Sequence, residues 1–521
     1  MKSKYFAPAA LFILMLSMTA YSQAPVVSCE SLAKLALPDT TITMAQAVAS
    51  GEFKPPDGGP PGPKQDVAQA PIPAFCRVAA TMKPSSDSDI KIEVWLPLSG
   101  WNGKFLGVGG GGWAGRIAYN GNPIGLIDAV RRGYAAANTD TGHDASTSRG
   151  GSFIPGHPEK LIDYGYRAVH EMTVKAKAIV AAYYGVPPKR SYFIGCSLGG
   201  MQAVVEAQRF PEDYNGIVAG APANPMTLFN AAQIWPTWLI SKDPSRSIPA
   251  SKFPMIHTAA LKACSTPVGV NDGLIEEPDR CTFDPQQLLC KGTDGPDCLT
   301  APQVDLMRQI YAGPINPRTK ESIFPGPPIG AELQLGMYAG NEAMENALSL
   351  YRYAVFQDPD WNWRTMDYDS AMALAAKVVD PAMRASSNLK LFVDHGGKLM
   401  LYIGWTDYHN PMEVAGYYNA ALKGVGSSKG KDSLRLFIIP GMDHCGGGAG
   451  CDTFEKLGPL EQWVEQGKAP EQILTSKLTD GKVIRTRPVC AYPKVAKHKG
   501  TGDINKAENF VCAEEKAAGK R

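Results

Sequence analysis

A serine and a histidine, each next to a cysteine, are the residues of this sequence whose types and surroundings could do chemistry together. Ser197 is the centre of a Gly-x-Ser-x-Gly pentapeptide, GCSLG, and follows Cys196. His444 precedes Cys445 in the segment GMDHCGG. A serine hydroxyl at its ordinary pKa is a poor nucleophile, and it needs a histidine that takes its proton and a carboxylate that orients the histidine. These residues predict acyl transfer by a catalytic triad.

The chain around Ser197 has the pattern of a nucleophile elbow. Residues 190–195 form an apolar run typical of a strand, 197–210 has the pattern of a helix, and a second apolar run follows at 216–223. In such an elbow the turn from strand to helix is so tight that the flanking residues must be small, and the turn raises the serine hydroxyl above the edge of the sheet. We therefore expect Ser197 to be a nucleophile rather than an incidental surface serine.

The acid and the base should follow the serine in the order Ser, Asp, His. His444 comes directly after an apolar run at 434–440, where we expect the base. Asp407 ends another predicted strand and is the expected acid. Asp443 is the rival acid, but a direct neighbour of His444 is poorly placed to orient its ring. The other histidines after the serine occupy less suitable positions: His257, His395, His409 and His498.

The two cysteines beside these residues predict a disulfide. If Ser197 and His444 meet within hydrogen-bond distance, Cys196 and Cys445 come close together as well. A bond between them would clamp the nucleophile loop to the base loop. The chain-entropy model assigns so long a closed loop about 5 kcal/mol of stabilisation, before strain is subtracted.

Strand and helix signals alternate in two parts of the chain. Short β-branched or aromatic runs alternate with longer amphipathic segments from 91 to 223, and compact apolar runs return at 397–407 and 433–440. This order favours a mostly parallel α/β sheet. The segment 226–385 differs, with many prolines and four cysteines, and we expect it to be an insertion that folds over the sheet. It also contains four of the nine tryptophans, which could line an aromatic pocket or form a core: Trp235, Trp238, Trp361 and Trp363.

Composition and the first residues set the class of protein. A formal net charge of +2 and the lack of long charged runs before the Lys-rich C-terminal end give no sign of a nucleic-acid partner. Residues 1–22 have the charged start, apolar stretch and small residues of a secretory signal peptide. The apolar stretch is shorter than the ~20 residues of a membrane span. We expect a secreted or periplasmic protein with no membrane partner; the sequence sets no oligomeric state.

Export to an oxidising compartment would account for the many cysteines of this chain. The chain has eleven, and no two have the C-x-x-C spacing of a zinc or redox site. In an oxidising compartment we expect disulfides, and the odd number leaves at least one free thiol.

The motifs resemble those of the tannase and feruloyl esterase family of α/β-hydrolases, whose hallmark is a cysteine-serine, aspartate, histidine-cysteine arrangement. The matching segments include GCSLGG, EAQRFPEDYNGIVAGAPA, GWTD, GMDHCGGG and WVEQGKAPE. The resemblance implies an α/β-hydrolase core of mostly parallel sheet with a large disulfide-containing lid between the nucleophile and the acid. The core would comprise 23–225 and 386–521, and the lid 226–385.

The same resemblance implies roles for individual residues. Ser197 would be the nucleophile, Asp407 the orienting acid and His444 the base. Cys196 would pair with Cys445. The other implied disulfides leave Cys451 over: Cys29–Cys76, Cys264–Cys281, Cys290–Cys298 and Cys490–Cys512.

A glycine-rich stretch, Gly107–Gly115, is the expected oxyanion loop. We expect Gly111 or Gly112 to present a backbone N–H to the oxyanion, together with the N–H of Leu198. Losing one such donor costs about 3 kcal/mol of barrier. The stretch also satisfies G-x-G-x-x-G, the pattern of a nicotinamide oxidoreductase, but no clear amphipathic helix opens at its last glycine.

The calcium loop that the lid of related enzymes often carries is degenerate here. Of its acidic residues only Asp272 remains. Calcium takes six to eight oxygen ligands, several of them anionic, so Asp272 with the carbonyls of Val270 and Leu274 would bind it weakly at best. No cofactor is expected for catalysis.

The resemblance implies an esterase acting on small aromatic esters, such as feruloyl, galloyl or related phenolic esters. Terephthalate monoesters, or the broader range of a general carboxylesterase, are the alternatives within the same chemistry. A catalytically silent secreted binding module and an NAD-dependent oxidoreductase are the alternatives from other classes.

Overall fold

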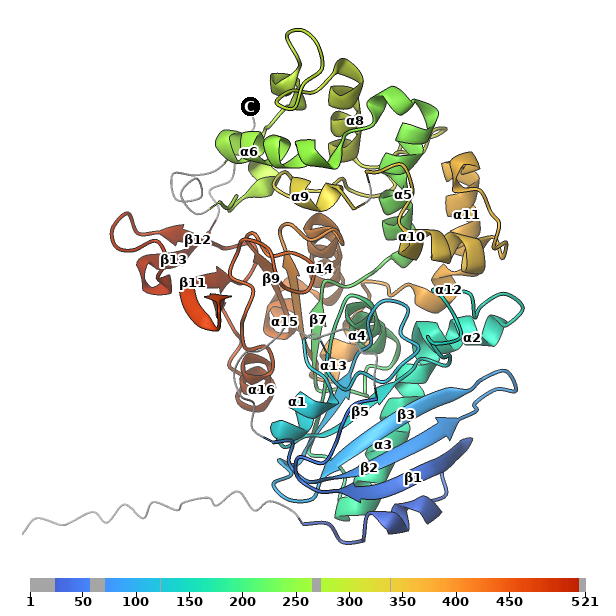
Figure 1. Ribbon diagram of the computed structural model, residues 1–521. Coiled ribbons are helices and arrows are strands. Elements are labelled where there is room, and N and C mark those ends of the chain that lie inside the picture. The colour runs from blue at the N-terminus through green and yellow to red at the C-terminus, as the bar shows by residue number, and fades with distance from the viewer. Residues whose placement is uncertain (1–23, 57–70, 122, 265–272, 338, 515–521) are drawn as a thin grey trace, which may run out of the picture.

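A nine-stranded sheet forms the centre of the protein (Figure 1). The computed structural model describes residues 24–56, 71–121, 123–264, 273–337 and 339–514. The strand order is β1-β2-β3-β5-β4-β6-β7-β8-β9. The strands have the following bounds: β1 (Thr40–Val48), β2 (Phe75–Met82), β3 (Ile90–Pro97), β4 (Lys104–Val108), β5 (Ala135–Thr139), β6 (Arg190–Cys196), β7 (Gly216–Gly220), β8 (Lys398–Gly404) and β9 (Leu434–Ile439).

The sheet is parallel from β5 to β9 and antiparallel in its first part. The pairs β1–β2, β2–β3 and β3–β5 are antiparallel, and every later pair is parallel. The strands β5, β7 and β9 are buried at every position, as expected of parallel strands covered on both faces. The mostly parallel α/β sheet predicted from the sequence is confirmed.

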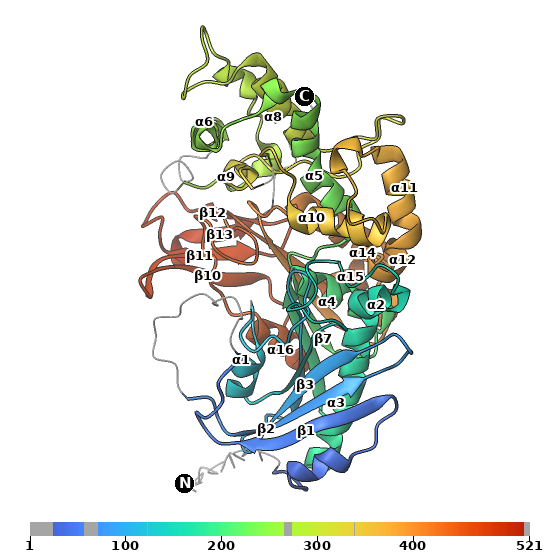
Figure 2. The same ribbon diagram turned by 45° about the vertical axis from the view of Figure 1, so that its right-hand side comes forward.

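Helices cover both faces of this sheet. On one face lie α1 (Leu126–Arg131) and α16 (Leu457–Gln466), and on the other lie α3 (Ala168–Tyr184), α4 (Leu198–Arg209) and α14 (Pro411–Val425) (Figures 1 and 2). In the part of the chain that the structure describes, no helix has both the length and the apolar character needed to cross a membrane.

The helices of segment 226–385 lie together beyond the carboxyl ends of the parallel strands, at the top of Figure 1. The longest, α5, extends from the end of β7 toward the other helices of this segment. These helices are α5 (Met226–Lys242), α6 (Phe253–Cys264), α8 (Ala301–Ala312), α9 (Glu332–Leu335), α10 (Glu345–Ser349), α11 (Tyr368–Val378) and α12 (Asp380–Met383).

Two hairpins complete the chain. The strands β10 (Gln472–Thr479) and β11 (Lys482–Cys490) form the first, and β12 (Val495–His498) and β13 (Phe510–Ala513) form the second. A disulfide between Cys490 and Cys512 joins them.

Five disulfides join ten of the cysteines, in the pairs that the family resemblance implies. Besides Cys490–Cys512 they are Cys29–Cys76, Cys196–Cys445, Cys264–Cys281 and Cys290–Cys298. Cys451 is free and only 3% exposed. Burial raises the pKa of its thiol, which makes it a poor thiolate nucleophile.

Candidate active site

The chain turns sharply at Ser197, between β6 and α4. The backbone of this serine has φ 63° and ψ −119°, a strained conformation for a residue other than glycine. Its N–H donates to the carbonyl of Gly220, the last residue of β7. A Cβ on Gly195 would lie 2.5 Å from the carbonyl oxygen of Gly199, so the tight turn requires glycine before the serine. Strand, strained serine and helix together have the geometry of a nucleophile elbow.

His444 and Asp407 form a hydrogen-bonded pair. The imidazole Nδ1 of His444 lies 2.9 Å from Oδ1 and 3.1 Å from Oδ2 of Asp407. The carboxylate is fully buried, whereas 18% of the His444 side chain is exposed. Burial alone would raise the pKa of Asp407, but His444 and the backbone N–H of His409 favour the carboxylate and hold its pKa below the ordinary value. An ionised acid therefore faces the ring that it orients.

The carboxylate of Asp443 contacts Thr406 and not the imidazole of His444. Its Oδ1 accepts a hydrogen bond of 2.7 Å from Thr406 Oγ1, and burial raises its pKa. The geometry thus joins Asp407 rather than Asp443 to the imidazole of His444. Two other histidines pair with acids away from Asp407: His257 with Glu332 and His395 with Glu212.

A disulfide brings the serine loop and the histidine loop together. Cys196 and Cys445 are bonded, with their Cα atoms 6.0 Å apart, and the bond spans 249 residues of sequence. Ser197 and His444 each lie one residue from this bridge. The Ser197 hydroxyl makes no hydrogen bond to any residue that the structure describes, so the expected contact with His444 is absent. Such contacts are often long in free enzymes and tighten when substrate binds.

The glycine-rich loop after β4 packs on the nucleophile elbow. A Cβ on Gly109 would lie 2.7 Å from the Cα of Gly199. The N–H of Gly110 donates to Gln202 Oε1, and the N–H of Gly199 donates to the carbonyl of Gly110. These two N–H groups are therefore already engaged.

Three backbone donors near the elbow remain unengaged. Within the described ranges the N–H groups of Gly111, Gly112 and Leu198 have no hydrogen-bond partner. Space around both glycines is open, since a Cβ on either would meet nothing within 4 Å. These three residues are the ones that the sequence predicts as oxyanion donors, and their N–H groups are free to donate to a ligand. The next helix, α1, begins at Leu126, well beyond the loop, so the arrangement differs from a dinucleotide-binding turn.

Known proteins carry the same combination of sequence and fold. Residues 76–513 match the family model "Tannase and feruloyl esterase". This chain belongs to that family. An uncharacterised esterase of Xanthomonas campestris pv. campestris is 38% identical, over 94% of this chain and 91% of its own length. The mono(2-hydroxyethyl) terephthalate hydrolase of Piscinibacter sakaiensis is 30% identical, over 85% of each chain. The crystal structure of feruloyl esterase B from Aspergillus oryzae superposes with a TM-score of 0.84 at 28% identity, covering 93% of this chain and 99% of that one.

Membership fixes the class of reaction. The chain is a carboxylic ester hydrolase of the tannase and feruloyl esterase type, with an α/β-hydrolase fold and small ester substrates. Enzymes of this family generally need no cofactor for catalysis. The silent binding module and the NAD-dependent oxidoreductase are both excluded by this assignment.

In this esterase two aromatic rings that the sequence did not predict pack against His444. The ring of Tyr408 lies 4.4 Å from that of His444, and the ring of His409 lies 4.1 Å away. Phe229, on α5, packs against His409 at 4.2 Å. Because Tyr408 and His409 directly follow Asp407, their position in the chain was the available signal.

His409 is held as a neutral imidazole. Its Nδ1 lies 2.8 Å from the carbonyl oxygen of Ala221, and burial, with the nearby His444, lowers its pKa to about 3. It therefore carries no charge beside the base at neutral pH, and its Nδ1 donates to Ala221.

The tryptophans of segment 226–385 pack against neighbours within that segment. Trp235 stacks on Trp238 at 5.3 Å, and both contact Tyr368. Trp361 stacks on Phe356 at 4.7 Å, and Trp363 is 2% exposed. These contacts place them in the core of the segment, and the aromatic rings around His444 come from other residues.

A cavity of about 70 Å³ lies beside the loop that carries His444, between segment 226–385 and the sheet domain. Thr406 and Asp443 line it from the core, and His257 and Leu274 line it from the other side. Its lining residues include neither Ser197 nor His444.

The predicted calcium loop falls mainly outside the described residues. Asp272 and Val270 are not among them, and Leu274 is buried at 3% exposure.

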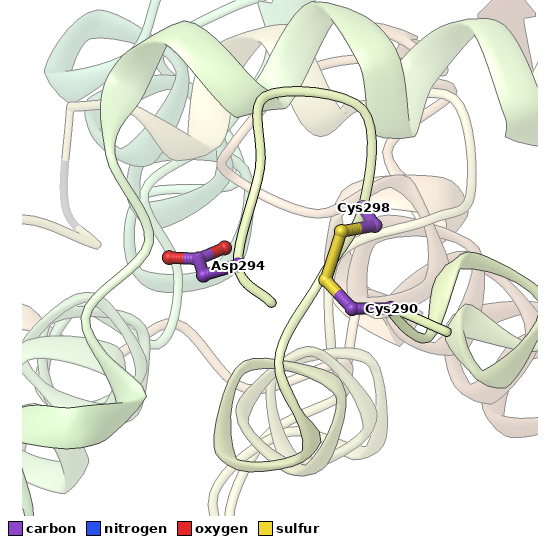
Figure 3. Close-up of side chains that lie close together, drawn as sticks. All are labelled: Cys290, Asp294 and Cys298. Atoms are coloured by element: carbon purple, nitrogen blue, oxygen red, sulfur yellow. A yellow bond between two sulfur atoms is a disulfide. The ribbon is translucent and has the colours of Figure 1, made fainter. Parts of the chain in front are cut away.

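Two other groups of side chains are arranged as metal ligands could be. The first contains Cys290, Asp294 and Cys298 (Figure 3). Its two sulfur atoms are bonded to each other, and Asp294 Oδ1 accepts from Lys252 Nζ at 2.6 Å. It therefore offers no thiolate and no free carboxylate.

The second group contains His170, Glu206 and Asp213. His170 Nδ1 lies 2.7 Å from Asp213 Oδ2, and Lys177 Nζ donates to the Asp213 carbonyl. Burial and the neighbouring Asp213 raise the pKa of Glu206. The raised pKa favours the neutral form of Glu206, which is a weaker metal ligand than a carboxylate.

Proposed function

We propose that this esterase cleaves aromatic carboxylic esters by two-step acyl transfer, with Ser197 as nucleophile, His444 as base and Asp407 as orienting acid. The observation that carries the proposal is the hydrogen-bonded Asp407–His444 pair on a loop that a disulfide ties to the strained serine elbow. The three residues occur along the chain in the order Ser, Asp, His, which is the order of the catalytic triad in α/β-hydrolases.

In the first step His444 takes the proton of Ser197 as the hydroxyl oxygen attacks the ester carbonyl. The tetrahedral oxyanion is stabilised by N–H groups of Leu198 and of Gly111 or Gly112. The C–O bond to the alcohol breaks, and His444 returns the proton to the leaving alcohol. In the second step His444 activates a water that attacks the acyl-enzyme, and the acid is released as Ser197 regains its proton.

An aromatic acyl group is supported by the relatives and by the site. Two relatives that align with most of this chain are named feruloyl esterase B and mono(2-hydroxyethyl) terephthalate hydrolase. Phe229, Tyr408 and His409 place aromatic rings within contact of each other next to His444. Phenolic esters and terephthalate monoesters share the flat ring that such a surface can stack.

Export through the leader 1–22, which lies outside the described residues, completes the proposal. Five disulfides suit a secreted or periplasmic protein. We assign 23–225 and 386–521 to the hydrolase core and 226–385 to a lid, because the latter helices gather beyond the carboxyl ends of the strands.

The test is the initial rate of hydrolysis by the mature protein of methyl ferulate, methyl gallate, a terephthalate monoester and p-nitrophenyl butyrate. We expect a marked preference for one aromatic ester and no activity in Ser197→Ala, whose circular dichroism should match that of wild type. Equal rates in Ser197→Ala would overturn the nucleophile, and a preference for butyrate would overturn the aromatic substrate.

A further inference from the structure

The oxyanion loop is held on both sides of Gly111. On one side the N–H of Gly110 donates to Gln202 Oε1 at 2.9 Å. On the other side the hydroxyl of Tyr164 donates to the carbonyl of Gly112 at 3.1 Å. The peptide groups 109–110 and 112–113, one before and one after Gly111, are thus each held by a side chain. The N–H of Gly111 itself has no partner within the part of the chain that the structure describes.

Both side chains that hold the loop are buried. Gln202 is 1% exposed and Tyr164 is 0% exposed. The ring of Tyr164 stacks on Trp113, the residue after Gly112, with centroids 5.1 Å apart. The loop glycine Gly112 has φ +59°, a conformation that a larger residue would strain.

Gln202 also links the loop to the nucleophile. It lies on α4, the helix that begins directly after Ser197. The N–H of Gly199, in the first turn of that helix, donates to the carbonyl of Gly110 at 3.0 Å. Ser197 and the oxyanion loop are therefore both held by the same helix, α4.

We propose that Tyr164 and Gln202 are positioning residues for oxyanion stabilisation: they hold the carbonyl of Gly112 and the amide of Gly110, and thereby aim the N–H of Gly111. The inference rests on the proposed acyl-transfer function. Oxyanion donors act because they are preorganised, and displacing a catalytic group by about 1 Å can lower a rate by about 100-fold. Both side chains are buried, so they act through the loop that they hold.

The test compares Tyr164→Phe with Tyr184→Phe in the full mature chain. Tyr184 is a matched control because it is also 0% exposed and its hydroxyl also donates to a backbone carbonyl, that of Pro97, at 2.8 Å. Both variants lose a buried hydroxyl that donates to a backbone carbonyl. Of the two tyrosines, Tyr164 donates to the oxyanion loop, whereas Tyr184 donates to Pro97. Gln202→Met, which removes the acceptor of Gly110, is the second variant.

Two ligands separate positioning from packing. An aryl trifluoromethyl ketone accepts the Ser197 oxygen at its carbonyl carbon, the serine proton passes to His444, and the resulting hemiketal oxyanion occupies the oxyanion site. The corresponding aryl carbinol, which has the same ring but no carbonyl group, binds without forming an oxyanion. Dissociation constants for both are measured with kcat and KM on the preferred ester.

We expect Tyr164→Phe and Gln202→Met to lower kcat by about 10- to 100-fold, with KM nearly unchanged. Affinity for the ketone should fall by the same factor, and affinity for the aryl carbinol should stay at the wild-type value. Tyr184→Phe should keep wild-type kcat and ketone affinity. If Tyr164→Phe changes both no more than Tyr184→Phe does, the inference is overturned. Failure of the proposed function would show differently, as an inactive wild type or an active Ser197→Ala.

Discussion

The imidazole rings of His409 and His444 lie 4.1 Å apart, with their planes inclined by 40°. One histidine is the proposed base, and the other is buried, neutral and bonded to the carbonyl of Ala221. The ring of His409 packs against that of His444, and the backbone N–H of His409 donates to the Asp407 carboxylate.

Replacing His409 by alanine separates these two contributions, because the backbone N–H remains. We expect kcat/KM to fall by about 10-fold, because the ring of His444 loses a packing contact that fixes its orientation. The exposed histidine His395, replaced by alanine, is the control and should keep wild-type kinetics. Unchanged kcat/KM in His409→Ala would show that Tyr408 and Asp407 suffice to orient the base.

Asp407→Asn and Asp443→Asn test the assignment of the acid. Asparagine at 407 can hold the wrong tautomer of His444, and we expect kcat to fall by about 10⁴-fold. Asp443 contacts Thr406 and not the imidazole, so Asp443→Asn should retain most of the wild-type kcat. Steady-state kinetics on one aromatic ester decide the matter. A larger loss at 443 than at 407 would exchange the two roles.

The disulfide between Cys196 and Cys445 should affect both stability and activity. The bond spans 249 residues, against 8 for Cys290–Cys298. The chain-entropy model then predicts losses of up to about 5 kcal/mol and about 2.5 kcal/mol in the free energy of unfolding when each pair becomes serine. Urea denaturation measures the difference.

The two double variants should also differ in kcat. Removing the bridge at Cys196 frees the serine and histidine loops from each other, so kcat should fall even under conditions where the variant is folded. Removing the bridge at Cys290 should leave kcat unchanged. Equal kcat in both variants would mean that the active-site bridge only stabilises the fold.

Asp140 makes stability depend on pH. Burial raises the pKa of this carboxyl from 3.8 to about 7, although its Oδ1 accepts from the N–H groups of Lys91 and Gly142. Because the folded state favours the protonated form, its contribution is complete below about pH 4 and is lost as the pH rises to 7. Asp140→Asn cannot ionise and keeps the accepting oxygen.

The stability of Asp140→Asn relative to wild type should therefore increase between pH 4 and pH 7. The full shift corresponds to about 4 kcal/mol. Thermal unfolding of both proteins across this range measures it. A difference that stays constant with pH would show that Asp140 is not protonated in the folded enzyme.

Local pattern and chain order were enough to predict the elbow at Ser197 and the positions of Asp407 and His444. Each of these residues ends a strand or follows one closely, and the parallel sheet brings such ends to one edge. The antiparallel strands β1 and β2 were not predicted, because their partly exposed residues give a weaker signal than the fully buried strands.

Contacts between distant elements could not be predicted in this way. Gln202 and Tyr164 meet the oxyanion loop only in the folded protein, and no spacing in the sequence marks them. The tryptophans show the opposite problem, because an aromatic residue that lines a pocket and one that fills a core look alike in sequence. Only their partners, such as Trp238 and Tyr368 around Trp235, separate the two cases.

The pairing of β7 with β8 has a consequence for how the chain is made. Gly216 lies opposite Lys398 in the sheet, yet all of segment 226–385 is synthesised between them. Until β8 emerges from the ribosome, β7 is an open edge, and the nascent chain contains the serine without its acid or its base. Closing so long a loop is slow, since non-local contacts are costly to form. Ser197, Asp407 and His444 can therefore come together only after β8 and β9 have joined the sheet.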